Sequence, residues 1–146
     1  WGNTHPNENT FTIGNGSSSN NTGGANDVLA YCFAEIEGFS KFGSYTGNGN
    51  ADGTFVYTGF RPAYVMIKWT GGASDWRIWD STRDTYNTAT AELLANSNAD
   101  EETPLALDLL SNGFKPRVSD SEYNLSGGTY IYMAFAESPF KYANAR

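Results

Sequence analysis

The residues best suited to contact a ligand are aromatic and lie close together in the middle of the sequence. Their ring faces could stack on the apolar face of a sugar and form a platform for glycan rings. The aromatic members of this platform are Tyr64, Trp69, Trp76, Trp79 and Tyr86, and the polar members are Arg77, Asp80 and Arg83. The alternative interpretation is structural: Trp76 and Ile78, or Trp79, face a core, while Arg83 and Asp84 form a surface turn.

Acidic residues allow a catalytic interpretation. Glycoside hydrolysis uses two carboxylates, and any two of four acids could meet in the folded chain: Glu35, Asp80, Asp108 and Glu137. No spacing singles out a pair. His5 is the only histidine and lies in a loop-rich start, so Ser-His-Asp and Cys-His catalysis lack a suitable base. We therefore predict a module without catalysis and keep a glycan-degrading enzyme as an alternative.

Two oxygen-rich stretches could hold calcium. Asn48, Asn50 and Asp52 resemble part of a calcium loop, but their spacing departs from the EF-hand pattern and the closing Glu is missing. The run 96–102 contains three consecutive acids. We favour plain loops at both places, predict no cofactor, and keep calcium as an alternative.

Cys32 is the only cysteine, which excludes an internal disulfide, and its aromatic neighbours favour a buried thiol.

Charge and hydropathy restrict the expected partners. The net charge of −7 and the pI near 4.5 argue against nucleic acid, whose binding depends on Lys and Arg. The same charge disfavours anionic membrane surfaces. Apolar runs stay short of the roughly 20 residues that cross a bilayer, so we expect no membrane insertion. Because Trp1 stands in place of Met, we expect a processed product or a portion of a longer protein.

Short apolar segments separated by Gly, Asn and Ser predict a β protein. Aromatic residues make up 15% of the chain, which favours sheets. Strands are predicted at 11–13, 28–35, 39–45, 54–57, 63–69, 75–80, 105–110, 114–118 and 129–136. Hairpin turns are predicted at 46–53, 70–72 and 111–113. The segment 89–96 could be a helical turn or an irregular loop.

These elements predict an all-β fold, an antiparallel β-sandwich that is jelly-roll-like, with long Gly/Asn-rich loops and at most one short helix. Residues 1–27 are expected to form an extended or loop-rich segment, and residues 28–146 to form the sandwich domain. One core is expected at this length. The run 28–35 is apolar almost throughout, which predicts a central strand.

A pattern near the start of the chain returns near its end. Gly23-Gly24 followed by Tyr31–Glu35 resembles Gly127-Gly128 followed by Met133–Glu137. Phe11 and Phe114 occupy comparable places upstream of each copy. If the echo is structural, residues 1–35 are the closing half of a preceding unit and residues 36–137 form a complete one. The strands 28–35 and 129–136 could then lie side by side.

Several motifs resemble an uncharacterised domain that recurs in tail-fibre-like proteins of tailed bacteriophages. They are Ala34-Glu35, Ser40–Gly49, Asp52-Gly53, Phe55–Ala63, Ile78–Asp80 with Arg83-Asp84, Leu109–Phe114 and Ser126–Glu137. The resemblance covers residues 28–146. It implies a position near the C-terminus of a long virion protein, often after a concanavalin-like lectin domain, with no established catalytic residues. Here a short N-terminal piece stands where a lectin domain would be expected.

Resemblance and aromatic content together predict a non-catalytic module on a virion surface or outside the cell. Its predicted role is assembly in a tail fibre or receptor-binding protein, with binding of a host glycan. The expected partners are further copies of the chain, other virion proteins and the glycan, but not nucleic acid. A head-decoration protein and an extracellular filament subunit, whose residues 1–26 extend into a neighbouring molecule, are the alternatives.

Overall fold

The computed structural model describes residues 5–14 and 29–138. The chain divides into two compact units, Trp1–Phe33 and Ala34–Arg146. The described residues of the first unit form no helix or strand, so the strand predicted at 11–13 is absent. Within residues 5–14, Asn7 builds a turn, because its Oδ1 accepts hydrogen bonds from the backbone N–H groups of Asn9 and Thr10.

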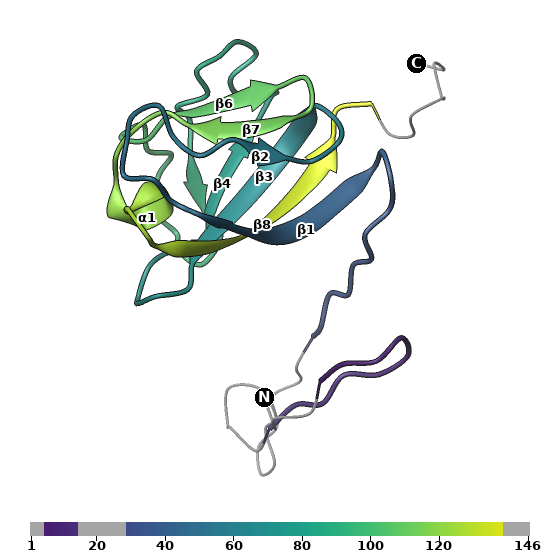
Figure 1. The fold of residues 1–146 in the computed structure, drawn as a ribbon. Helices are drawn as coiled ribbons and strands as arrows, with labels where there is room; N and C mark the ends of the chain where they lie inside the picture. Colours follow the sequence, from purple (N-terminus) through teal and green to yellow (C-terminus); the bar gives the residue numbers. More distant parts are fainter. Residues whose placement is uncertain (1–4, 15–28, 139–146) are drawn as a thin grey trace. The chain divides into compact units, whose positions relative to one another are not determined.

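The second unit is a sandwich of two antiparallel sheets (Figure 1), which confirms the predicted all-β fold. One sheet has five strands in the order β1-β8-β3-β4-β5, and the other has three in the order β2-β7-β6. The strands are β1 Ser40–Thr46, β2 Val56–Tyr57, β3 Pro62–Trp69, β4 Arg77–Asp80, β5 Leu93–Leu94, β6 Leu107–Leu110, β7 Gly113–Pro116 and β8 Thr129–Ala136. A single turn of helix, α1 (Ser121–Asn124), lies between β7 and β8 in the chain.

Two predicted hairpins and the last predicted strand are confirmed. β3 pairs with β4, and β6 pairs with β7, so that Leu110 lies opposite Gly113 across a two-residue turn. Gly113 is required there because a Cβ atom would lie 2.1 Å from the carbonyl oxygen of Val56 in the neighbouring strand. The strand over residues 129–136 is formed with the predicted bounds.

The hairpin predicted around 46–53 is wrong. β1 pairs with β8 while β2 pairs with β7, so this loop crosses from one sheet to the other. The buried Asn124 holds the loop in place, because its side chain accepts from the N–H of Asn48 and donates to the carbonyl of Asn50. A turn-rich sequence indicates a reversal of the chain, but it does not indicate which strands pair.

The predicted central strand over 28–35 is also wrong where the structure describes it. Residues 29–35 lie outside every strand, and Cys32 is exposed rather than buried. β8 lies between β1 and β3, so residues 29–35 are not its neighbours. Ile36 forms an isolated bridge to Ser40 by exchanging backbone hydrogen bonds with it, and the Ser40 hydroxyl donates to the carbonyl of Ala34.

The segment 89–96 contributes the short strand β5, and not a helix. It is held in extended conformation by bridges from Ala89 to Leu107 and from Glu92 to Glu102. These partners are distant in sequence, so they override the local helical composition. The one helix of the described residues is α1, where the side chain of Asp120 caps the first turn by accepting from the N–H of Glu122.

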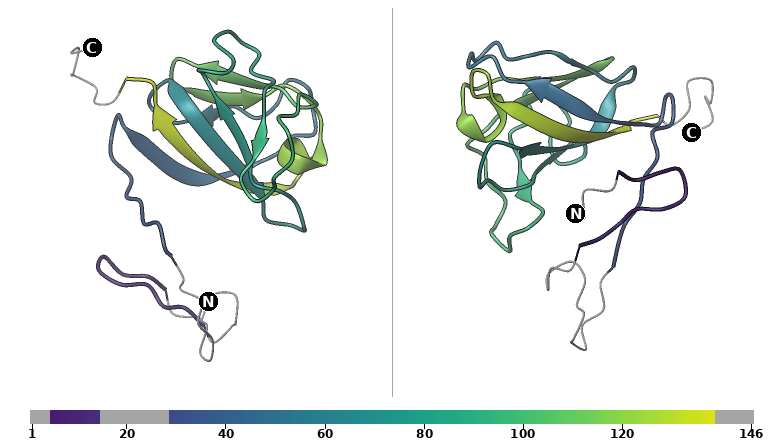
Figure 2. Two further views of the ribbon diagram at one scale, coloured as in Figure 1. Left: turned by 180° about the vertical axis from the view of Figure 1, so that it is seen from behind. Right: turned by 60° about the horizontal axis from the view of Figure 1, so that its bottom comes forward.

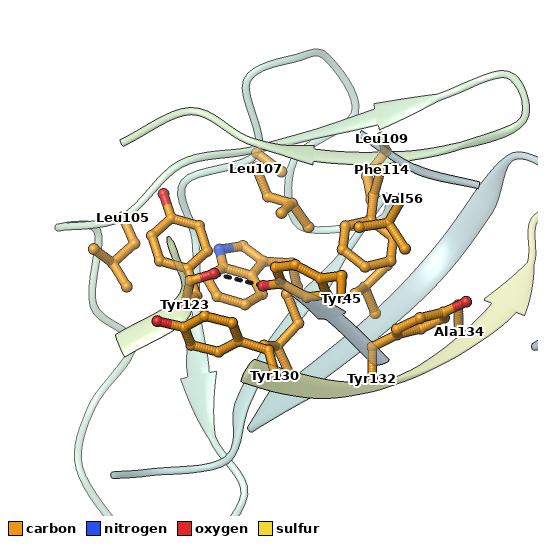
Figure 3. Close-up of a cluster of buried hydrophobic side chains, with 14 of the residues drawn as sticks. Tyr45, Val56, Leu105, Leu107, Leu109, Phe114, Tyr123, Tyr130, Tyr132 and Ala134 are labelled. Carbon is orange, nitrogen blue, oxygen red and sulfur yellow. Dashed lines mark hydrogen bonds between the residues drawn. The ribbon is translucent and has the colours of Figure 1, made fainter. Parts of the chain in front are cut away.

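The core fills the space between the two sheets and is rich in tyrosine (Figure 3). The two further views in Figure 2 show the three-stranded sheet lying over one face of the five-stranded sheet. The Tyr45 and Tyr130 rings stack with centroids 5.1 Å apart, and Tyr123 stacks on Trp79 at 5.6 Å. The hydroxyls of Tyr45, Tyr123 and Tyr130 donate to the backbone carbonyls of Tyr123, Ala106 and Ser121, respectively. Burial raises the pKa of Tyr45 well above its ordinary value, so it remains a neutral donor.

Candidate functional site

The structure does not bring the predicted aromatic platform together: its members lie on both faces of the five-stranded sheet and in segments outside the strands, with Tyr64 on the outer face opposite Asp80. Trp79 faces the core, is 0% exposed and lies opposite Val65. Trp69 also packs against the core. Trp76 is half-buried, and Tyr86 lies in a loop with 85% of its surface exposed. Trp69 and Trp79 are therefore core residues and not parts of a sugar platform, because strand alternation turns them inward.

Arg77 also points inward and forms a buried ion-pair cluster. Its guanidinium contacts the carboxylate of Glu92, which is fully buried, and approaches Glu122 at 3.5 Å. The Ser74 hydroxyl donates to the same Glu122 carboxylate at 2.5 Å. Burial raises the pKa of Glu92, and the charge of Arg77 opposes that shift. Arg77 is thus a structural residue, and nothing in the sequence near Arg77 singles out Glu92 or Glu122 as its partners.

The opposite face of the same sheet carries an apolar row that crosses all five strands. Successive cross-strand partners make up this outer row, which is Phe42, Met133, Met66, Ile78 and Leu93. Leu93 is 38% exposed and the other four are half-buried. Both methionines of the chain belong to it. Sequence reasoning missed the row because its five members come from segments that show no relationship until the register is known.

Aromatic and aliphatic side chains extend the outer row on both sides. Phe135 lies opposite Tyr64, two positions along the strands from the Met133–Met66 pair. Its ring centroid is 6.0 Å from that of Phe42 and 5.9 Å from that of Tyr64. Ile131, which is 39% exposed, lies on the other side opposite Lys68. The outer face therefore has an apolar centre with polar groups at its margin.

The predicted polar ligands Asp80 and Arg83 bind each other at that margin. The Arg83 Nε atom lies 2.6 Å from Asp80 Oδ2, and Arg83 also contacts Glu101 at 3.1 Å. Burial alone would raise the pKa of Asp80, but hydrogen bonds from Arg83 and Thr82 hold it below its ordinary value. The Asp80–Arg83 pair therefore stabilises a surface turn, and both side chains already bind each other. Asp84 serves the same loop by accepting from the N–H groups at 90 and 91.

The four acids considered for catalysis each bind a different basic side chain. The pairs are Glu35 with Lys41 at 2.5 Å, Asp80 with Arg83 at 2.6 Å, Asp108 with Arg117 at 3.5 Å, and Glu137 with Arg61 at 3.3 Å. Two carboxylates that cleave a glycoside must face one another across the sugar. These four are instead separate ion pairs.

The oxygen atoms of the first candidate calcium loop are engaged within the protein. Asn48 accepts from the N–H of Asn50, and Asn50 accepts from the N–H of Asp52. The Asp52 carboxylate lies 2.5 Å from Lys115 and 2.9 Å from Arg117. Within residues 5–14 and 29–138, no group of three or more His, Cys, Asp or Glu side chains could hold a metal ion.

A small cleft adjoins the start of β1. It has a volume of about 370 Å³ and lies between the turn at 35–38 and the segment 57–60. Lys41, Tyr57 and Thr58 line it. The Thr58 hydroxyl already donates to the carbonyl of Phe60, and Lys41 is paired with Glu35. Sequence reasoning missed the cleft, because no motif joins its two segments.

Among the described residues, no helix is long and apolar enough to cross a membrane.

Comparison with known proteins places the chain in a family. No curated protein and no solved structure matches the chain. One family model, described as a domain of unknown function (DUF7483), matches residues 1–139, which is nearly the whole sequence. The chain therefore belongs to the DUF7483 family of domains.

Proposed function

We propose that this chain is a non-catalytic assembly module that associates with further copies of itself through the outer face of its five-stranded sheet. The observation that carries the proposal is the outer row, an apolar line across five adjacent strands. A sheet in a sandwich needs only one apolar face to form its core. Here the three-stranded sheet covers one face (Figure 2), and the other face carries the apolar outer row.

The physical support for self-association is the shape and composition of this face. Adjacent strands lie about 4.8 Å apart, so five strands make an apolar band roughly 19 Å wide. Apolar surface contributes about 25 cal/mol for each Å² removed from water. The margin carries Ser44, Lys68 and Asp80. An apolar centre within a polar rim is the usual composition of a protein interface.

A second copy is the occupant that fits this face best. In a two-fold contact the same patch lies on both partners, so an apolar row meets an apolar row of equal length. Sheets that pack face to face interdigitate such side chains at a separation of about 10 Å. Unbranched Met66 and Met133 at the centre can adapt to the opposing surface.

The setting that we propose is the surface of a tailed-bacteriophage virion, in a tail fibre or receptor-binding protein. It is supported by the resemblance of motifs between residues 34 and 137 to domains of such proteins. A head-decoration protein or an extracellular filament would use the same face in the same way. Repeated contacts between identical modules are what each of these assemblies requires.

Host-glycan binding is a second candidate function, favoured by the aromatic groups that remain outside the core. Tyr86 is 85% exposed, and Tyr64 lies beside the Asp80–Arg83 pair. We expect Tyr86→Ala to reduce binding on a glycan array without changing the oligomeric state. Binding that is absent from the wild-type protein, or equal in both proteins, would reject this role.

Size-exclusion chromatography with light scattering tests the assembly role. Wild-type protein is expected to elute as an oligomer whose mass falls on dilution. Ile78→Lys places a charge in the middle of the outer row and should give a monomer. Tyr57→Lys is the matched control, because Tyr57 is 63% exposed on the other sheet and should leave the oligomer intact.

Circular dichroism should show the same sheet content for all three proteins, since neither substituted side chain lies in the core. A wild-type protein that is monomeric at its highest soluble concentration would contradict the proposal. An oligomer that survives Ile78→Lys would assign the contact to a different surface and contradict it equally.

A further inference from the structure

Residues 29–35 carry the sequence of a strand but lie outside the two sheets. Leu29 is 74% exposed and Tyr31 is 78% exposed. In an extended chain these two share one side, while Ala30 and Cys32 share the other. Exposed apolar strand sequences with open edges promote aggregation, so natural proteins cover them. Leu29 and Tyr31 are therefore the side chains of this segment that a covering body would bury.

The echo within the sequence indicates what that body is. Ala34-Glu35 corresponds to Ala136-Glu137 at the end of β8, and the paired glycines 23–24 correspond to 127–128. The stretch between the glycines and Ala-Glu is two residues longer in the first copy. A difference of two preserves which face each later residue occupies, because strand alternation has a period of two.

Aligning the two Ala-Glu pairs assigns a face to each residue of the segment. Cys32 takes the place of Ala134, which is 0% exposed, and Ala30 takes the place of Tyr132, which is 7% exposed. Both of these β8 residues face the core between the sheets. Leu29 takes the place of Ile131 on the outer face. The echo thus predicts a buried position for the thiol that is exposed in this chain.

The place that such a strand would occupy in this body is already filled. β8 is bonded to β1 on one side and to β3 on the other, through seven paired positions each. A second strand with the same pattern therefore requires a second set of these neighbours. The family match, from residue 1 to 139, includes both copies of the pattern.

We propose that Leu29–Glu35 is the closing strand, equivalent to β8, of a second sandwich of this same fold that lies upstream in the same polypeptide. The interaction surface is the strand itself, and its partner is the gap between the β1 and β3 equivalents of that upstream body. Four residues, 36–39, then separate the closing strand of one sandwich from the first strand of the next. This inference is independent of the outer row and of the proposed assembly.

A tandem fusion tests the inference. Residues 36–112, which contain β1 to β6, are placed ahead of the full chain, so that the upstream copy lacks a closing half of its own. The fusion lengthens the loop where residue 112 of the upstream copy joins residue 1 of the full chain. The added loop should cost little stability, because the entropy of loop closure grows slowly with loop length. Modification of Cys32 by a thiol reagent should be slower than in the unfused chain by at least about 100-fold. Hydrogen exchange at 29–35 should slow in parallel.

Two matched variants of the fusion test the assigned faces. Ala30→Asp places a carboxylate in the upstream core and should restore fast modification of Cys32. Leu29→Asp places the same group on the outer face and should leave Cys32 protected. Equal effects of the two variants would contradict the alignment.

A third variant separates a packing defect from a wrong inference. Ala30 is smaller than the Tyr132 side chain that it would replace, so the fusion could contain a destabilising cavity. Ala30→Tyr restores the ring and should protect Cys32 even if the unmodified fusion does not. Fast modification in both fusions would overturn the proposal. Protection in the unfused chain that rises with protein concentration would assign the strand to a second copy and also overturn it.

Discussion

The inner and outer faces of the five-stranded sheet both carry apolar side chains, but the side chains of the inner face are more deeply buried. On β4 the inner residues are Arg77 and Trp79, which are 9% and 0% exposed, while the intervening Ile78 is half-buried on the outer face. On β8 the inner Tyr130 is fully buried and the neighbouring Ile131 is 39% exposed. Hydropathy alone does not distinguish these faces. The difference is that another sheet covers one of them.

This comparison explains why the candidate sugar platform failed as a unit. A strand with aromatic or aliphatic residues on both sides fits a core on either side, so the sequence leaves the choice open. Trp79 was a candidate ligand contact because its ring face could stack on the apolar face of a sugar. Its position opposite Val65, within the inner layer, decides its role.

The largest contrast is expected between two tryptophans that are three residues apart. Trp79→Ala should lower the free energy of unfolding by about 3–5 kcal/mol, because it removes a fully buried ring and leaves a cavity. Trp76→Ala removes a half-buried ring and should cost clearly less. Urea denaturation of both variants provides the measurement. Equal losses would contradict the placement of Trp79 in the core.

The next largest effect is expected from a buried hydroxyl. Tyr123 accepts from the N–H groups of Ala106 and Val118 and donates to the Ala106 carbonyl. Tyr123→Phe keeps the ring but leaves these groups without a partner, which should cost about 1–3 kcal/mol. Tyr86→Phe, at an exposed position, is the control and should have no measurable effect in thermal denaturation.

The inner ion-pair cluster should make stability depend on pH. Because burial raises the pKa of Glu92 above its ordinary 4.5, the folded protein binds this proton more tightly than the unfolded chain. The contribution is therefore most favourable below pH 4.5 and declines as pH rises through the folded pKa. Glu92→Gln removes this decline. The difference in unfolding free energy between wild type and variant should fall as pH rises, and a constant difference would contradict the assignment.

The outer face should show the smallest effect on the stability of the single chain. Met66→Ala and Ile78→Ala remove half-buried side chains and are expected to cost about 1 kcal/mol or less in the monomer. Urea unfolding at low protein concentration measures this cost. A loss as large as that of Trp79→Ala would place the row in a core.

The parts of the fold that were predictable from the sequence depend on local signals. Asn112-Gly113 between two apolar runs specified the β6–β7 hairpin, and the apolar, aromatic-rich run 129–136 specified β8. The unpredicted parts depend on distant partners. Asn124 holds the loop at 46–53 across the sandwich, and Glu92 meets Arg77 only when β5 pairs with β4.

The candidate site was harder to predict than the fold for the same reason. The outer row requires four correct registers before its members become neighbours. A shift of one residue in any strand would exchange its two faces. The strand predicted at 28–35 is not formed where the structure describes it, because an apolar run alone does not reveal which strands would pair with it.

Oxidation of the two methionines tests the central claim most directly, because Met66 and Met133 are the only methionines of the chain and both lie in the outer row. Hydrogen peroxide converts an accessible methionine to its sulfoxide, and mass spectrometry measures the rate at each position. We predict that both rates fall together as protein concentration rises, and that Ile78→Lys keeps them high at every concentration. Rates that are independent of concentration in the wild-type protein would contradict the claim that this face joins copies of the chain.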